Sequence, residues 1–82
     1  MQQIEVRIAD IKVPDHRMRQ YDKRVAHQLA EDISQWGLLH RITIRLYRES
    51  DGNWTYVLVA GLHRLRAHEI LGCETIRCNL TD

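Results

Sequence analysis

The stretch from residue 56 to residue 72, YVLVAGLHRLRAHEILG, constrains the fold of this chain more than any other. Its first half is a continuous apolar run rich in valine, which is typical of a strand buried on both faces. Gly61 ends the run and allows the backbone to turn sharply. The pattern then becomes helical and ends at Gly72, which suits a C-terminal cap. We therefore predict a strand, a glycine turn and a helix over residues 62–71, with apolar positions at Ala67, Ile70 and Leu71.

The start of this predicted helix has the features of a phosphate site. His63 and Arg64 fall in its first turn, where backbone N–H groups lack intrahelical acceptors and the helix dipole is positive. A glycine turn, free amides, a histidine and an arginine at one point can bind a phosphate group. An alternative fits these residues equally well: Gly61 is only a turn, and the His63–Arg64 pair is a solvated surface pair.

Length, composition and charge limit the class of protein. The 82 residues suit one domain, residues 1–82, and 44% apolar with 28% charged residues is the composition of a soluble globular domain. The net charge of +1 is the difference between 12 basic and 11 acidic residues, so no global field attracts polyanions. Binding to nucleic acid or phosphate must therefore come from local clusters.

The chain has no sequence feature of a membrane or secreted protein. Its apolar runs are only a few residues long, and the N-terminal residues MQQIEVR lack the apolar region of a signal peptide. We expect a cytoplasmic location and no membrane contact. Cys73 and Cys78 are too few for a disulfide framework and should remain thiols in a reducing compartment.

The N-terminal region predicts two extended segments and a loop. Ile4, Val6 and Ile8 alternate with polar residues, which indicates a strand with one buried face. Residues 10–14 read as a second short extended segment, because a proline disfavours a helical residue before it. Residues 15–21 are highly charged and show no period, so we predict a loop.

A longer helix follows this loop. Asp22 is suited to cap its start, and Gly37 is suited to end it. Its apolar residues recur at spacings of four, four and three, as on one face of a helix. They are Val25, Leu29, Ile33 and Trp36, with Ala26 and Ala30 alongside.

The remaining segments predict strands. Residues 41–47 alternate apolar and polar side chains, and the Asp–Gly pair in ESDGN connects them to residues 54–60 as an antiparallel hairpin. Ile76, Cys78 and Leu80 alternate in a last strand. The predicted order is β-β-α-β-β-α-β, an α+β fold with a small mixed sheet that the two principal helices cover.

Metal binding and cysteine chemistry fit the sequence poorly. His63, His68, Cys73 and Cys78 are spaced at intervals of five, whereas zinc ligands prefer closer pairs. The two histidines would lie about 140° apart around a helix. Cys73 follows a helix C-terminus, where the dipole opposes a thiolate. We predict no metal site, and among the carboxylates we select Asp15 as the candidate catalytic residue, because Asp22 has a capping role.

Basic residues gather in several short segments. If the loop before the first long helix, the turn after it and the start of the second helix come together, they form a positive rim around Gly61. Such a rim suits a nucleotide triphosphate or a nucleic-acid backbone. The alternative is that arginines alternating along a strand are its solvated face, which fits Arg41 and Arg45. The groups are Arg17, Arg19, Lys23 and Arg24; His40, Arg41, Arg45 and Arg48; and His63, Arg64 and Arg66.

Several blocks occur in the order found in one family. GLLHRITIR, a hairpin turn and YVLVAGLHRLRAHEILGCETIRC together resemble the ParB N-terminal domain, of the ParB/sulfiredoxin fold, over nearly the whole chain. In the partition proteins of this family, a Gly-Glu-Arg-Arg-x-Arg-Ala helix and a Gly-Leu-Leu turn bind the phosphates of CTP. Here Leu62 replaces the glutamate and His63 the first arginine. The resemblance implies a nucleotide site at Gly37, Leu38, Leu39, Gly61, Leu62, His63, Arg64 and Arg66.

The departures from the partition motif leave the identity of the nucleotide undecided. The His63–Arg64 pair resembles the Gly-Cys-His-Arg of sulfiredoxins, which holds ATP phosphates, but Leu62 replaces the catalytic cysteine and argues against sulfinic acid reduction. Free serine kinases of this fold also carry a His–Arg pair, with a catalytic glutamate in the loop where this chain has Asp15. The implied ligand is CTP or ATP, with or without Mg²⁺. Loss of the motif's glutamate argues against metal-assisted CTP hydrolysis.

Our first hypothesis is a ParB-like nucleotide-binding domain in a DNA-related process such as plasmid or chromosome partition, gene regulation or nuclease action. Partition proteins continue into a helix-turn-helix where this chain ends, so we expect any specific DNA recognition to need a DNA-binding partner protein. The alternatives are a phosphotransferase that uses ATP or ADP with Asp15 as its base, and a ParB-like DNase, for which no metal–carboxylate cluster is visible. A homodimer is also a hypothesis, because a domain with so small a core gains stability from self-association.

Overall fold

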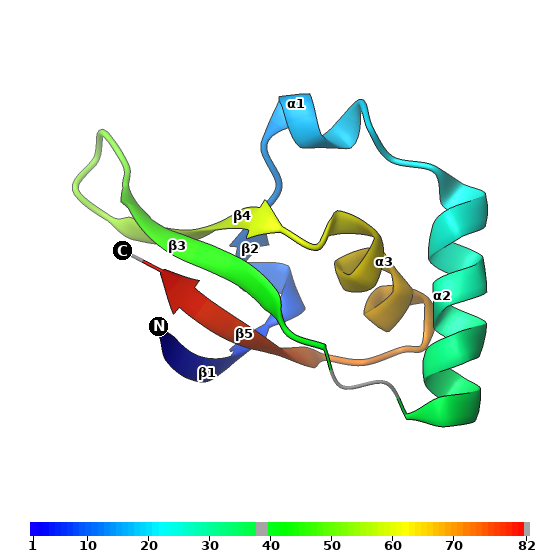
Figure 1. Cartoon of the computed structure of the whole chain (residues 1–82). Helices are drawn as coiled ribbons and strands as arrows, with labels where there is room; N and C mark the ends of the chain where they lie inside the picture. The colour runs from blue at the N-terminus through cyan, green and yellow to red at the C-terminus, as the bar shows by residue number, and fades with distance from the viewer. Residues whose placement is uncertain (38–39, 82) are drawn as a thin grey trace.

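A mixed β-sheet forms the centre of the molecule (Figure 1). The computed structural model describes residues 1–37 and 40–81. Within this part of the chain, five strands are arranged in the order β1-β5-β3-β4-β2. The strands are β1 (Gln2–Arg7), β2 (Ile11–Lys12), β3 (Ile42–Arg48), β4 (Trp54–Ala60) and β5 (Thr75–Thr81).

Strand pairing confirms the mixed sheet that the sequence predicts. β3 and β4 form the antiparallel hairpin, with Tyr47 opposite Thr55. β5 pairs with β3 in parallel and with β1 antiparallel, and β2 adds to β4 in parallel. The hairpin turn is closed by a hydrogen bond of 2.9 Å from the Gly52 N–H to the Glu49 carbonyl. The last strand therefore lies inside the sheet, between β1 and β3.

The helical segments include two short turns that were not predicted. Ile8, expected in the first strand, lies in a 3₁₀ turn. The prediction of a loop over residues 15–21 is wrong at its start, where the N–H groups of Arg17 and Met18 donate to the Pro14 carbonyl at 2.9 and 3.2 Å. A single turn is too short to show a period. The helical segments are η1 (Ile8–Asp10), α1 (Asp15–Met18), α2 (Lys23–Trp36) and α3 (Leu62–Ile70).

The ends of α2 agree with the prediction, but its buried face does not consist of its large apolar residues. The Asp22 side chain accepts from the Arg24 N–H at 2.9 Å, and Gly37 ends the helix with φ +65°. Ala26 and Ala30 are buried, whereas Val25 is 48% and Trp36 76% exposed. α2 packs against α3, and small residues allow two helices to approach closely.

The buried side chains of α3 also differ from the predicted set. Leu62, Leu65 and Ala67 are buried, whereas Ile70 and Leu71 are exposed near the helix end. α3 lies between the sheet and α2, so the two long helices form successive layers (Figure 1). The expectation that both helices cover the sheet therefore holds for α3 only, because α2 packs on α3.

The hydrophobic core joins the sheet to the inner side of α3. Its strand residues come from β1, β2, β3, β4 and β5, and α3 supplies two leucines. Burial of these side chains is the main favourable term in folding. The core residues are Val6, Ile11, Ile42, Ile44, Leu58, Leu62, Leu65, Ile76 and Cys78.

The buried thiol of Cys78 should make the protein less stable at alkaline pH. Burial raises the pKa of Cys78 from 9.0 to about 11. Because the pKa of the folded state is the higher one, this contribution to stability is complete below pH 9 and is lost as pH rises toward 11. We expect Cys78→Ala to lower stability at neutral pH and to lose less stability than wild type above pH 9. Urea unfolding across this pH range measures the difference.

Cys73→Ala is the matched control, because Cys73 is exposed. It should follow the wild-type pH profile. If the free energy of unfolding changed with pH in the same way for Cys78→Ala and wild type, the result would contradict the burial argument.

Candidate functional site

The Gly61 turn brings the start of β3 against the start of α3. Gly61 has φ +102°, and a Cβ at this position would lie 2.8 Å from Cγ2 of Ile42 and 3.3 Å from its Cα. An L residue would therefore be strained by both its backbone conformation and its contacts. Arg41 directly precedes Ile42 but lies away from this turn, in a pocket that it lines with Glu5 of β1 and Arg77 of β5.

The first turn of α3 offers hydrogen-bond donors. The Leu65 N–H donates to the Gly61 carbonyl at 2.9 Å, so the intrahelical ladder begins there. The amides before Leu65 have no acceptor within the helix, and the helix dipole is positive at this end. No acidic residue occurs in this turn. The end of α3 at Gly61 is therefore suited to an anion.

His63 is held in place by the two residues that precede α2. The Asp22 N–H donates to Nε2 of His63 at 3.0 Å, and the ring stacks on Tyr21 with centroids 5.7 Å apart. An Nε2 that accepts a hydrogen bond carries no proton, so the neutral ring has its proton on Nδ1. His63 therefore joins the starts of α2 and α3 and keeps an Nδ1–H donor.

Arg64 has a buried donor without a partner. Its Nε is buried and has no hydrogen-bond acceptor among the described residues. A buried N–H without an acceptor is costly, and more so on a charged group. The backbone around Arg64 is fixed, because its carbonyl bonds Nδ1 of His68 at 2.8 Å. Arg64 therefore brings to the first turn of α3 a buried donor that has no acceptor among the described residues.

Arg66 has a different set of contacts. Its guanidinium pairs with Glu69 one turn along α3, and its Nη2 lies 3.4 Å from Sδ of Met18. These contacts attach α1 to α3 and neutralise the arginine. The structure therefore directs Arg66 away from the first turn of α3.

Three more of the predicted site residues, Gly37, Leu62 and Asp15, lie in the described part of the chain. Gly37 ends α2, about 21 Å along that helix from Asp22. Leu38 and Leu39 lie outside the described residues. Leu62 is buried in the core, so it offers a ligand only its backbone N–H. Asp15 is exposed at the start of α1.

Tyr21 and the Asp22 amide were missed as site residues from the sequence. Tyr21 ends a segment without a period, and Asp22 already has a local role as a helix cap. Their contacts with His63 cross about half of the chain, and Asp22 is separated from His63 by 41 positions. A capping residue directly before a helix was the only local signal.

Two further observations concern metals and membranes. In residues 1–37 and 40–81, His, Cys, Asp and Glu side chains form no group of three or more that could hold a metal ion. The helices in the described part of the chain also lack the length and apolarity needed to cross a membrane.

A family model that matches the whole chain identifies the family of this protein. The model of the ParB N-terminal domain matches residues 1–82. This chain belongs to the ParB N-terminal domain family. A chloroplastic/mitochondrial sulfiredoxin of Arabidopsis thaliana is 36% identical over 77 residues, which cover 94% of this chain and 58% of that protein. This ParB N-terminal domain thus spans less than two thirds of the relative.

Solved structures confirm the ParB/sulfiredoxin fold. Sulfiredoxin from Arabidopsis thaliana has a TM-score of 0.77 and 34% identity, with 100% of this chain and 86% of that chain covered. ParB from Caulobacter crescentus, complexed with CTP-γ-S, has a TM-score of 0.78 and 25% identity, covering 100% of this chain and 45% of that one. A free serine kinase in complex with AMP has a TM-score of 0.77 and 15% identity, with 98% of this chain and 31% of that chain covered. At this identity the likeness shows the fold alone.

Substitution of Gly61 should destabilise this ParB N-terminal domain strongly. Gly61→Ala combines a left-handed backbone with a Cβ that would lie 2.8 Å from Ile42. We expect the free energy of unfolding to fall by about 2–4 kcal/mol. Urea denaturation followed by circular dichroism measures it.

Gly52→Ala is the matched control for this substitution. Gly52 also has a positive φ, +90°, but nothing lies within 4 Å of its added Cβ. It should lose only about 1–2 kcal/mol. Equal losses for the two variants would show that the contact with Ile42 adds nothing.

The tautomer of His63 can be measured directly. Because Nε2 accepts the Asp22 N–H, we expect long-range ¹H–¹⁵N NMR at neutral pH to show a protonated Nδ1 and an unprotonated Nε2. Exposed His16 provides the comparison for a ring free to exchange tautomers. A protonated Nε2 on His63 would show that this hydrogen bond does not form.

Proposed function

We propose that this domain binds the phosphate groups of a nucleotide, CTP or ATP, at the Gly61 turn and the first turn of α3, and that it acts in a DNA-related process. One observation carries the proposal: the buried Nε of Arg64 has no acceptor among the described residues. Burial of a charged donor without an acceptor is costly unless a ligand completes the site.

The donors around this position suit phosphate. Arg64 contributes a guanidinium, α3 contributes its first amides, and His63 contributes Nδ1–H. Phosphate oxygens only accept hydrogen bonds from these groups at neutral pH, so all of the contacts would be favourable.

Each residue would have a distinct task. The guanidinium of Arg64 would bind phosphate oxygens and neutralise their charge, while Tyr21 and the Asp22 amide keep the His63 ring oriented. Gly61 would provide the sharp turn that starts α3 directly against Ile42. The resemblance adds Gly37, Leu38 and Leu39 as the proposed second part of the site.

Relatives support a nucleotide and a connection with DNA. ParB of Caulobacter crescentus, at 25% identity, forms a complex with CTP-γ-S. The same ParB is a chromosome-partitioning protein, which connects the family with DNA. Membership of the ParB N-terminal domain family favours a similar ligand for the present chain.

The site does not favour sulfiredoxin chemistry. The resemblance implies that Leu62 stands in place of the catalytic cysteine of sulfiredoxins, and Leu62 is 7% exposed within the core. Cys73 follows the opposite end of α3. The proposal therefore includes nucleotide binding and no reduction of sulfinic acids.

Loss of Arg64 should weaken nucleotide binding selectively. A charge-assisted hydrogen bond is worth about 1.5–3 kcal/mol, so Arg64→Ala should raise the dissociation constant by about 10–150-fold. Calorimetric titration with CTP, ATP and ADP, each with Mg²⁺ and at low and moderate salt, measures the change. Arg77→Ala is the matched control, because Arg77 is exposed on β5.

The titration separates the alternatives. Preference for CTP would support a partition-type nucleotide switch, and preference for ATP or ADP would favour the phosphotransferase with Asp15 as base. Unchanged affinity in Arg64→Ala, or an equal loss in Arg77→Ala, would contradict the proposed site.

A further inference from the structure

The β3–β4 hairpin holds an arginine against an aromatic ring at two positions. The guanidinium carbon of Arg45 lies 5.5 Å from the ring centroid of Tyr47, and that of Arg48 lies 5.8 Å from the ring centroid of Trp54. Arg48 and Trp54 are also opposite each other in the strand register. Tyr47 is 45% and Trp54 62% exposed. The hairpin therefore presents planar rings and positive charge together at the surface.

Neither of these arginines is in an ion pair within the part of the chain that the structure describes. The acidic residues of the hairpin loop have other partners. Glu49 lies 3.8 Å from Nζ of Lys12, and Asp51 accepts from the Asn53 N–H at 2.9 Å. The two guanidinium groups of the hairpin can therefore pair with an anion from outside the molecule.

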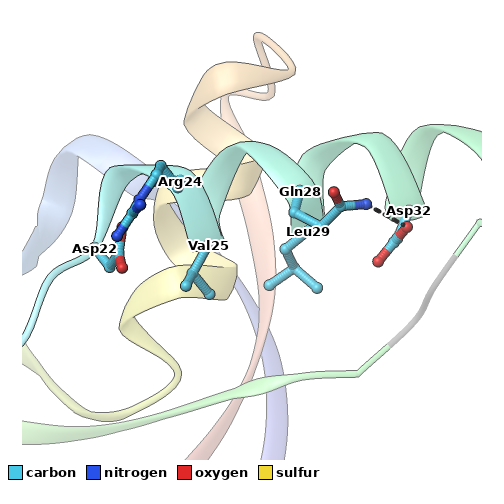
Figure 2. A pocket seen from close by; sticks show the side chains of 6 residues that line it. All are labelled: Asp22, Arg24, Val25, Gln28, Leu29 and Asp32. Carbon is cyan, nitrogen blue, oxygen red and sulfur yellow. Dashed lines mark hydrogen bonds and ion pairs between the residues drawn. The ribbon is translucent and has the colours of Figure 1, made fainter.

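An arginine of α2 shows the contrast. Figure 2 shows Arg24 beside Asp22, and its Nε lies 3.5 Å from Oδ1 of that carboxylate. The charge of Arg24 is thus already paired within the chain. It offers a matched control for the arginines of the hairpin.

The outer face of the sheet continues the positive surface. Alternation along β3 puts Arg45 and Tyr47 on the face that points away from the core. Farther along this face, Arg41 and Arg77 line a hollow of about 220 Å³ together with Glu5. A polyanion that follows β3 from residue 41 to residue 47 would pass these arginines over about 20 Å.

A second hollow lies beside the exposed tryptophan, at the outer edge of the sheet. It has a volume of about 460 Å³, and its lining includes Trp54, Tyr56 and Lys12. Asp10 also lines it and can accept a hydrogen bond from an amino group. This hollow provides space next to the ring for a planar group.

We propose that the β3–β4 hairpin and the adjoining outer face of the sheet bind single-stranded nucleic acid. Arg45 and Arg48 neutralise phosphates, while bases stack on Tyr47 and Trp54. The inference deepens the DNA-related part of the proposed function and rests on that part alone. It uses another surface than the nucleotide site, because Trp54 and Gly61 mark opposite ends of β4, about 20 Å apart (Figure 1).

The chemistry of this surface favours single strands over other polyanions. An acidic peptide offers negative charge but no repeated planar group to stack on the rings. A duplex offers phosphates, but its bases are paired and stacked on one another, so they do not reach a protein ring. A single strand offers both groups in each nucleotide.

The expected binding is weak and depends on salt. The chain has a net charge of only +1, so the attraction comes from the local contacts. Each phosphate contact with a single strand contributes about −0.7 to the slope of log affinity against log salt. Two contacts, through Arg45 and Arg48, give a slope of about −1.4.

Titration of a fluorescently labelled oligothymidylate, followed by anisotropy at several salt concentrations, tests the proposal. Trp54→Ala should raise the dissociation constant about 5–150-fold, because it removes one stacked base. Trp54→Phe should keep most of the affinity, since a phenyl ring also stacks. Trp36→Ala is the matched control, because Trp36 is exposed at the end of α2, and it should bind like wild type.

The arginines are tested through the salt dependence. Arg45→Gln and Arg48→Gln should each reduce the magnitude of the slope by about 0.7, whereas Arg24→Gln should leave it unchanged. Oligouridylate distinguishes RNA from DNA as the source of the strand. Binding of either one supports the proposal, and the tighter one identifies the class.

Nucleotide titration of the same variants separates this surface from the proposed nucleotide site. Trp54→Ala should bind CTP or ATP like wild type, and Arg64→Ala should bind oligothymidylate like wild type. If Arg64→Ala lost affinity for the oligonucleotide as strongly as for the nucleotide, the strand would occupy the Gly61 site and the proposal would be overturned.

Other results would also contradict the proposal: no binding by wild type at low salt, equal effects of Trp54→Ala and Trp36→Ala, or equally tight binding of duplex DNA or polyglutamate. Circular dichroism and urea unfolding check each variant. A less stable Trp54→Ala with unchanged affinity would show that the ring only stabilises the hairpin. If Trp54→Ala fails to fold, Trp54→Thr replaces it, because threonine favours a strand and cannot stack on a base.

Discussion

The contact between Gly61 and Ile42 is the constraint on which the rest of the structure depends. The chain leaves β4, turns at φ +102° and starts α3 with no space for a side chain above Ile42. This places Leu62 and Leu65 of α3 in the core with the strand residues, while His63 and Arg64 are half-buried. The same turn thus determines how closely α3 packs on the sheet and where its free amides lie.

α3 serves both stability and the candidate site. Leu62 and Leu65 pack into the core, and α2 packs on the other side of α3 through Ala26 and Ala30. His63 and Arg64 occupy the positions between these packed faces. Because neighbouring residues of the helix are buried, the backbone of both is held in place. A site that is already ordered loses less conformational entropy when a ligand binds.

The hydrogen bond from Asp22 to His63 connects the two long helices at their starts. It gives a backbone donor of α2 an acceptor and selects one tautomer of the imidazole. The side chains of His63 and Arg64 therefore both offer hydrogen-bond donors next to Gly61. Val25 and Trp36 of α2, in contrast, are exposed, whereas Ala26 and Ala30 are buried and suit the close approach of α2 to α3.

Local chemistry determined much of the fold from the sequence alone. The period of Val25 and Leu29, with Asp22 and Gly37 as caps, gave the bounds of α2, and alternation gave the strands of the hairpin. Gly61, His63 and Arg64 were identified as a candidate site because a glycine turn before a helix leaves free amides whatever surrounds it. Tertiary structure decided which side of α2 is buried, the pairing of Arg66 with Glu69 and Met18, and the contacts of Tyr21 and Asp22 with His63. These depend on the neighbours that the fold brings to each residue across the chain, and periodicity within one segment carries no information about them.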